Sequence, residues 1–209
     1  MKTIVFFDDI SIPVPTDAIY RRLGYRRRFT KVSARQRQDV DRSIEIALTH
    51  IHLKGAGVRV PVKIFEALRI DLDGVVCESA DLAKMLAGCD EVVLMAATAG
   101  SSIMQVIARN CSDEHLTEGV VADAVASEMV DAALDWIVAY FNRLLVREGR
   151  QLTRKRFSAG YGDFLLENQK IIHELLNLGR IGVAITAHHI LVPEKSVTAV
   201  AGVCRMINS

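Results

Sequence analysis

The stretch EVVLMAATAG, residues 91–100, decides the fold of this chain because it has the composition of a buried strand. Its apolar run from Val92 to Ala97 is continuous, and a threonine, an alanine and a glycine close it. A run of this length with such flanks suits a buried strand better than a helix. We therefore predict a central strand over residues 91–97.

Helical patterns precede this strand. Apolar residues recur at helical spacing over residues 34–53, and Gly55 and Gly57 follow as a stop. Residues 58–65 fit either a strand or the start of a second helix. Ser79 is placed to cap a short helix that a glycine at position 88 ends.

The longest helical pattern follows the strand and covers residues 115–147, with Gly119 as a candidate for its true start. Apolar residues fall on one broad face of this pattern, and we interpret the opposite, acidic face as a solvated surface. That face carries Asp123, Glu128, Asp131 and Asp135. Residues 103–108 and 165–178 are also predicted helices, and Gly179 is the expected end of the second.

Two further strands are predicted over residues 181–186 and 196–205, with Pro193 in the loop between them. Strands and helices therefore interleave without a regular βαβ rhythm. We predict an α+β fold, in which a mixed, mostly antiparallel twisted sheet is packed by helices. Residues 1–209 are expected to form a single domain, and residues 1–30 an irregular N-terminal arm that prolines interrupt.

The overall charge of the chain is nearly balanced, with 26 Lys and Arg against 25 Asp and Glu, and half of its residues are apolar. This balance argues against a protein that coats nucleic acid or an anionic membrane. No apolar run approaches the roughly 18 residues of a membrane helix, and the first residues do not resemble a secretory signal. We expect a cytoplasmic protein without nucleic-acid or membrane partners.

The basic residues of the N-terminal arm cluster at Arg21, Arg22, Arg26, Arg27 and Arg28. Such a cluster can grip phosphates. The neutral charge of the whole chain favours a solvated or partner-facing arm instead.

Cysteine and histidine positions do not predict a metal site. Cys77, Cys89, Cys111 and Cys204 form no CxxC pair, so we expect buried thiols. His188 and His189 are adjacent, and neighbours on a strand point to opposite faces of a sheet.

The segment RFSAGYGDF, residues 156–164, is the main candidate for a binding loop. Gly160 and Gly162 permit close approach of the backbone to a ligand, and a loop before a helix offers amide donors to a carboxylate. Arg156 can add a two-pronged bond to that carboxylate, and Tyr161 offers a ring face. Taken alone, the segment also fits an ordinary glycine turn, just as residues 193–195 fit a polar turn.

In combination these segments resemble the C-terminal activation domain of cobalamin-dependent methionine synthase. The resemblance rests on RxSxGYxDFxLxxQ from Arg156, then IxT and VPEKSV, and on VLMAATAG at residues 93–100 with Asp123 and Glu128 further on. It covers about residues 79–204. After the segment that matches the last predicted strand, the family's domain continues with a further strand and helix. The family also has an acidic residue near its start that contacts the cofactor, and its candidate matches here are Asp8, Asp9 and Asp17.

The resemblance implies a role in reactivating methionine synthase. Domains of this family bind S-adenosylmethionine and dock over a cobalamin domain, so that inert cob(II)alamin is reduced and methylated. This chain is thereby expected to work in trans, as part of a methyltransferase system, with a cobalamin-binding methionine synthase core and a flavodoxin- or ferredoxin-type electron donor. The alternative is a reactivation or docking subunit for another corrinoid-dependent methyltransferase, without S-adenosylmethionine binding of its own.

The resemblance also implies two sets of site residues. The S-adenosylmethionine-binding set, with Arg156 on the cofactor's carboxylate, is Arg156, Phe157, Ser158, Ala159, Gly160 and Tyr161. The set that docks against the cobalamin domain is Pro193, Glu194, Lys195 and Ser196. No catalytic or metal-ligating residue is expected in this chain. The cobalamin is expected on the partner, because this chain lacks the DxHxxG ligand motif of the family's cobalamin domain.

Overall fold

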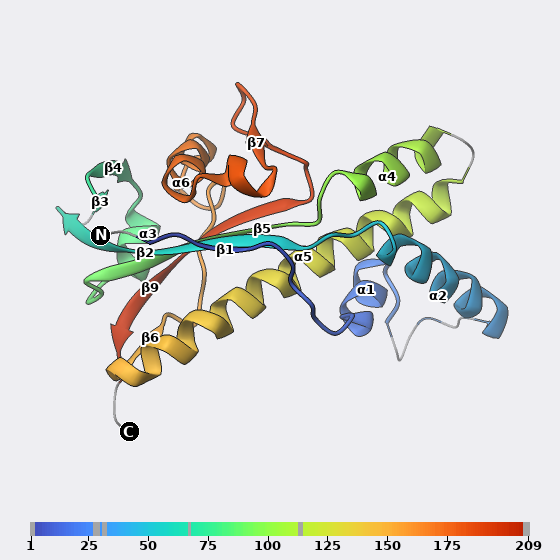
Figure 1. Cartoon of the computed structure of the whole chain (residues 1–209), viewed down its shortest axis with the longest axis horizontal. Helices are drawn as coiled ribbons and strands as arrows, with labels where there is room; N and C mark the ends of the chain where they lie inside the picture. Colours follow the sequence, from blue (N-terminus) through green and yellow to red (C-terminus); the bar gives the residue numbers. More distant parts are fainter. Residues whose placement is uncertain (1–2, 27–29, 31–32, 67, 113–114, 207–209) are drawn as a thin grey trace.

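A computed structural model of the chain describes residues 3–26, 30, 33–66, 68–112 and 115–206. Its centre is a seven-stranded sheet in the order β4-β3-β2-β5-β9-β6, with β1 beside β2 (Figure 1). All of these strand pairs are antiparallel. The strands are β1 (Val5–Phe7), β2 (Lys54–Phe65), β3 (Arg69–Leu72), β4 (Val75–Glu78), β5 (Glu91–Thr98), β6 (Arg150–Leu152) and β9 (Ser196–Arg205). A separate hairpin joins β7 (Ala184–Ile185) to β8 (Leu191–Val192).

The predicted central strand is confirmed. β5 pairs with β2 along one edge and with β9 along the other. Its alternate residues enter two separate cores: Val93 and Met95 pack on one face of the sheet, and Val92 and Leu94 pack on the other. Because a strand sends successive side chains to opposite faces, burial on both faces explains the continuous apolar run.

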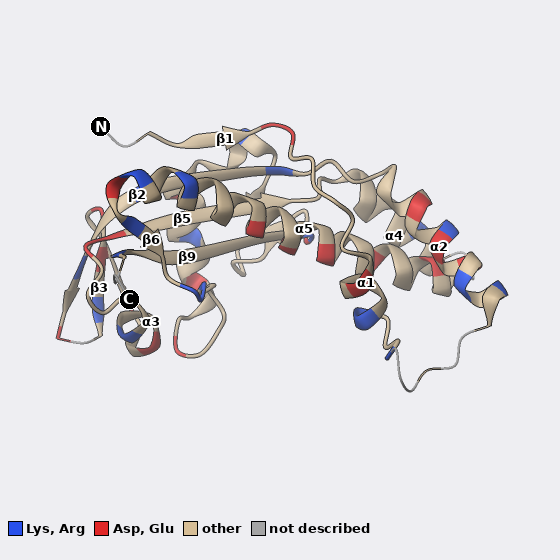
Figure 2. Cartoon of the chain, turned by 90° about the horizontal axis from the view of Figure 1, so that it is seen from below, with Lys and Arg blue, Asp and Glu red and all other residues tan. Residues whose placement is uncertain are grey.

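One face of the sheet is covered by the long helix α5 (Leu116–Leu145), with α1 (Thr16–Arg22), α2 (Ala34–Leu48) and α4 (Ser102–Ser112) packed beside it (Figure 1). The expected helix start at Gly119 is wrong. Gly119 lies inside α5, where an added Cβ would sit 3.1 Å from the Cys111 sulfur on α4. A glycine therefore lets these two helices approach closely. Acidic positions recur along α5 (Figure 2).

The opposite face is covered by α3 (Ala80–Met85) and α6 (Gln169–Leu176), with short 3-10 turns at Leu166–Asn168 and Leu178–Ile181. Ser79 caps α3 as predicted, since its hydroxyl accepts a hydrogen bond from the backbone N–H of Leu82. The expected end of the last helix at Gly179 is wrong. α6 ends at Leu176, and the residue that caps it, Asn177, takes the left-handed conformation at φ 50°.

Several other expectations need correction. The N-terminal arm contains β1 and α1, although Arg27 and Arg28 lie outside the described residues. Gly55 and Gly57 do not stop a helix: α2 ends at Leu48, and both glycines belong to β2. The strand expected over residues 181–186 shrinks to β7, and His188 and His189 lie in the turn after it.

The cysteines differ from the expected set of buried thiols. Cys89 and Cys204 form a disulfide, which joins the loop before β5 to β9. Cys77 is a buried free thiol, and burial raises its pKa to about 11. Cys111 is an exposed free thiol.

The predicted α+β class, with an antiparallel sheet packed by helices, is confirmed. Among the described residues, no helix combines the length and the apolar composition that crossing a membrane requires.

Candidate functional site

A cavity of about 430 Å³ lies where α5, the segment 156–161 and the start of β9 meet. This volume falls within the range of about 300–1,000 Å³ that is usual for small-molecule sites. The residues that line it are Asp131, Leu134, Arg156, Phe157, Ser158, Ala159, Tyr161, Gln169, Leu191, Ser196, Val197 and Thr198. Segments far apart in the sequence therefore build one concave site.

Backbone hydrogen bonds hold the segment 156–161 against the edge of the sheet. Phe157 forms two of them with Val200 on β9, with N···O distances of 2.9 and 2.8 Å. The chain then turns sharply, since the N–H of Gly160 donates to the carbonyl of Phe164 at 2.8 Å. Gly160 has φ 91°, a left-handed conformation that strongly favours glycine. The glycine in the motif is thus required by the turn itself.

The far end of this turn is tied to α3. The carboxylate of Asp163 accepts hydrogen bonds from the Ser79 hydroxyl at 2.5 Å and from the backbone N–H of Ala80 at 2.7 Å. These bonds, led by that of the Ser79 hydroxyl, lower the pKa of Asp163. Gly162 also lies close to α3, and a Cβ added to it would sit 2.5 Å from Oδ2 of Asp81. The segment that starts at Arg156 is therefore fixed at both ends.

The edge of β9 next to this segment presents backbone polar groups to the cavity. Val200 turns its N–H and C=O toward Phe157, and Gly202 turns its carbonyl toward Thr153. Alternate residues of a strand direct these groups to the same side, so those of Thr198 and Ser196 also point away from β5. Both residues line the cavity. On this edge of β9, β6 is the only described strand, and it pairs with Val203, Cys204 and Arg205 but not with Thr198 or Ser196. The β9 edge can thus donate to and accept from a ligand.

Two opposite charges line the same cavity. The Arg156 guanidinium forms an ion pair with Asp135 on α5 and keeps 26% of its side chain exposed. The pKa of Asp131, one turn earlier on α5, is raised by partial burial and by the negative charge of Glu128, while Arg156 and Arg22 act against this shift. A cation and an anion in one cavity complement a ligand that carries both a carboxylate and a positive group.

The structure brings most of the predicted binding residues together. Arg156, Phe157, Ser158, Ala159 and Tyr161 all line the cavity, and Gly160 shapes the turn between them. Their individual roles toward a ligand stay predictions.

The four predicted docking residues do not form one exposed surface. Ser196 lines the cavity and Glu194 is exposed, but Pro193 is buried. The Lys195 ammonium points to α5, where it lies 2.7 Å from the Asp123 carboxylate and 2.9 Å from the Ser127 hydroxyl. Lys195 thereby anchors its loop to α5, and its charge is engaged within the chain.

The sequence did not reveal that α5 lines this cavity. Asp131 is the charged residue that α5 contributes to the lining. The acidic face of α5 was interpreted as a solvated surface, and its helical spacing alone does not reveal that the segment 156–161 crosses it. The candidate acidic residues Asp8, Asp9 and Asp17 do not line this cavity. Asp8 instead lies 3.5 Å from the Arg180 guanidinium.

Exposed apolar side chains occur on the same segments that line the cavity. Tyr161 and Leu165 belong to the turn and its continuation, and Ile190 and Val192 belong to the β7–β8 hairpin. Tyr161 is 69% exposed although it lines the cavity. These side chains give the surroundings of the cavity a partly apolar surface.

Comparison with known proteins supports the fold. No protein-family model matches this sequence, and no curated protein matches it. Among solved structures, the chain is similar to a crystal structure of the MetH reactivation domain bound to AdoHcy, with a TM-score of 0.69 and 12% sequence identity. The similarity covers 100% of this chain and 80% of that one. At this identity the likeness shows a shared fold.

Proposed function

We propose that this chain binds S-adenosylmethionine in the cavity between α5, the segment 156–161 and β9. We further propose that it serves as a trans-acting activation subunit for a cobalamin-dependent methionine synthase. One observation carries the proposal: Arg156, Asp131 and the glycine turn line one cavity, in a fold shared with a reactivation domain that was crystallised with AdoHcy.

The charges of the cavity fit the amino-acid end of S-adenosylmethionine. The Arg156 guanidinium would bind the carboxylate, and Asp131 would face the ammonium or the sulfonium. The β9 edge at Ser196 and Thr198 and the backbone of Ser158 and Ala159 would hydrogen-bond the remaining polar groups of the ligand. The chain's own residues therefore bind and orient the ligand.

When bound, S-adenosylmethionine supplies a methyl group for the reductive methylation of cob(II)alamin held by a partner. The chain's contribution is to hold that methyl donor toward the partner, because such a transfer depends on orientation. The exposed side chains of Tyr161, Leu165, Ile190 and Val192 would be covered by the docked cobalamin domain. A flavodoxin- or ferredoxin-type protein would provide the electron.

A second candidate function is a docking or reactivation subunit for another corrinoid-dependent methyltransferase, without S-adenosylmethionine binding. Its support is that Arg156 already has a partner within the chain, the Asp135 carboxylate. An arginine satisfied in this way can hold the loop against α5 without binding any ligand. The two candidates therefore assign different roles to the same side chain.

Replacement of Arg156 tests S-adenosylmethionine binding directly. We expect the intact chain to bind S-adenosylmethionine in isothermal titration calorimetry. The Arg156→Ala variant should bind about ten- to a hundredfold more weakly, because a charge-assisted bond contributes about 1.5–3 kcal/mol. The matched control is Arg154→Ala, which removes an exposed arginine two positions earlier that does not line the cavity.

The partner is tested with a methionine synthase core that lacks its own activation domain. If the chain works through S-adenosylmethionine, it should restore turnover of the inactive core, and Arg156→Ala should not. Rescue by both forms would favour the docking role. Absence of S-adenosylmethionine binding, both alone and with the partner's cobalamin domain, would overturn the proposal.

A further inference from the structure

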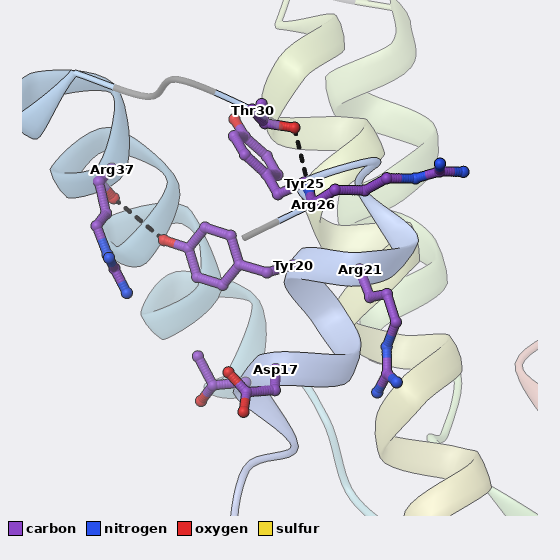
Figure 3. A pocket seen from close by; sticks show the side chains of 8 residues that line it. Asp17, Tyr20, Arg21, Tyr25, Arg26, Thr30 and Arg37 are labelled. Atoms are coloured by element: carbon purple, nitrogen blue, oxygen red, sulfur yellow. Dashed lines mark hydrogen bonds between the residues drawn. The ribbon is translucent and has the colours of Figure 1, made fainter. Parts of the chain in front are cut away.

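A second cavity, of about 570 Å³, lies between α1, α2 and the described residues 25, 26 and 30. It is lined by Thr16, Asp17, Tyr20, Arg21, Tyr25, Arg26, Thr30 and Arg37, and it shares none of these residues with the first cavity (Figure 3). The proposed binding of S-adenosylmethionine leaves this cavity without a role.

Two tyrosines form the centre of this cavity. The rings of Tyr20 and Tyr25 pack edge to face with their centroids 5.3 Å apart, and both residues are partly buried. The Tyr20 hydroxyl donates a hydrogen bond to the Asp41 carboxylate on α2 at 2.6 Å. Burial and this hydrogen bond raise the pKa of Tyr20 to about 12, so the phenol stays neutral. The aromatic centre is thus held in place by α2.

Exposed arginines border the tyrosines on two sides. Figure 3 shows Arg37 on one side of Tyr20, and Arg21 and Arg26 on the other. Within the part of the chain that the structure describes, none of these three arginines forms an ion pair. Against them stands a single carboxylate in the lining, that of Asp17.

The guanidinium of Arg37 is already positioned. Its carbon lies 5.5 Å from the centroid of the Tyr20 ring, in cation–π contact. A stacked guanidinium loses less side-chain freedom when it binds a carboxylate, because its planar fork is oriented beforehand. Arg22, next to Arg21 on α1, differs because its Nε donates to Glu128 on α5 at 2.5 Å. Of these two neighbours on α1, the arginine that has no ion pair among the described residues is therefore the one that lines the cavity.

We propose that this cavity is a docking surface for an acidic segment of a partner protein. An aromatic centre with a charged rim is the arrangement of protein–protein interfaces, where tyrosine and arginine are enriched. Unpaired arginines select a partner that presents aspartate or glutamate, because complementary charge steers association and suppresses wrong partners. Nothing in this inference depends on S-adenosylmethionine binding.

The position of the surface places such a partner near the first cavity. Arg22 on α1 lies 3.9 Å from the carboxylate of Asp131, which lines that cavity. A protein held on this surface would therefore contact a helix, α1, that also reaches the lining of the first cavity.

The test measures binding of a fluorescein-labelled oligoglutamate peptide to the full chain by fluorescence anisotropy. The test variant is Arg21→Gln/Arg26→Gln/Arg37→Gln. The matched control is Arg143→Gln/Arg147→Gln/Arg154→Gln, which removes the same charge from three exposed arginines: one in the last turn of α5, one in the 3-10 turn Val146–Glu148 that follows, and one shortly after β6. Circular dichroism checks that both variants are folded.

We expect the peptide to bind the intact chain, with an affinity that falls as salt is added. The test variant should bind about tenfold more weakly, and the control variant should change less than about twofold. Absence of peptide binding, or an equal loss in both variants, would overturn the proposal. Tighter binding of tripolyphosphate or of a single-stranded oligonucleotide at the same arginines would also overturn it, in favour of a phosphate site.

Discussion

At the scale of single residues, Asp163 joins two parts of the candidate site. Its carboxylate accepts hydrogen bonds from the Ser79 hydroxyl and from the first backbone N–H groups of α3. Its own backbone belongs to the glycine turn. A carboxylate in this position satisfies donors that the start of a helix leaves unpaired. Asp163 thereby couples the stability of α3 to the shape of the loop at residues 156–164.

The lowered pKa of Asp163 predicts how stability depends on pH. Because the folded pKa lies below the ordinary value of 3.8, the stabilisation is fully present above that value and is lost as pH falls through the folded pKa. Asp163→Asn should lower the Tm at neutral pH by a few degrees, and the difference from the intact chain should shrink in acid. Thermal unfolding followed by circular dichroism measures both.

The control for Asp163 is Glu167→Gln, which removes an exposed carboxylate that forms no ion pair among the described residues. Its Tm should stay close to that of the intact chain. An Asp163→Asn variant as stable as this control at neutral pH would contradict the capping role.

The sequence predicted the lining residues of the segment 156–161 and, on β9, Ser196, and it missed the other lining residues. Arg156 and Tyr161 stand in a glycine-containing segment that, taken alone, also fits an ordinary turn, and the ordered resemblance to a known family marked them as site residues. Asp131 and Gln169 were missed because they enter the cavity only through packing of α5 and α6. A helical pattern shows which face of a helix is polar, and it does not show what crosses that face.

At the scale of elements, α5 lies close to the sheet because β2 carries glycines beneath it. A Cβ added to Gly57 would overlap the Phe141 ring, and one added to Gly55 would sit 2.6 Å from Cδ1 of Ile137. Both partners are core residues of α5. Glycine at these positions therefore sets the distance between helix and sheet.

Replacement of Gly57 should disturb this packing. We expect Gly57→Ala to lower the free energy of unfolding by about 1–3 kcal/mol, because the ring in a closely packed core has little room to move. Urea denaturation measures the change. Gly179→Ala is the control, since an added Cβ there meets no atom within 4 Å.

A second substitution tests the cause. Phe141→Leu removes part of the overlapping ring, so it should restore part of the stability that Gly57→Ala loses. Strictly additive effects of the two substitutions would show that the contact is not responsible.

Elements with long, uniform patterns or a clear cap were predictable, and the shortest strands were not. β5 and α5 follow from an apolar run and a helical stripe. The two-residue strands β7 and β8 carry too few residues for any alternation to show. Gly55 and Gly57 were misread because a glycine after a helical pattern usually marks a helix end, whereas here tertiary packing requires them.

At the scale of the whole molecule, the Cys89–Cys204 disulfide connects residues 115 positions apart. Such a crosslink limits the freedom of the unfolded chain over most of the sheet, and bonds closing long loops typically contribute about 2–4 kcal/mol. It also decides which thiols remain. Cys111 is exposed, whereas Cys77 is buried.

Thiol titration tests this arrangement. One thiol per chain, Cys111, should react rapidly in the folded protein, because burial and a pKa near 11 suppress the reaction of Cys77. Two should react after denaturation without reductant, and all four after reduction. Four reactive thiols in the denatured, unreduced protein would show that the disulfide is not formed. Cys111→Ser should abolish the rapid reaction.

The position of β9 has a consequence for how the protein is made on the ribosome. β9 lies between β5 and β6, although both are synthesised before it. Until residues 196–205 have emerged, the nascent chain cannot complete the sheet between these two strands. The backbone hydrogen-bonding groups along one edge of the apolar strand β5 then stay unpaired. We therefore expect translation intermediates that end before β9 to be the forms most in need of chaperones and most prone to associate through that edge.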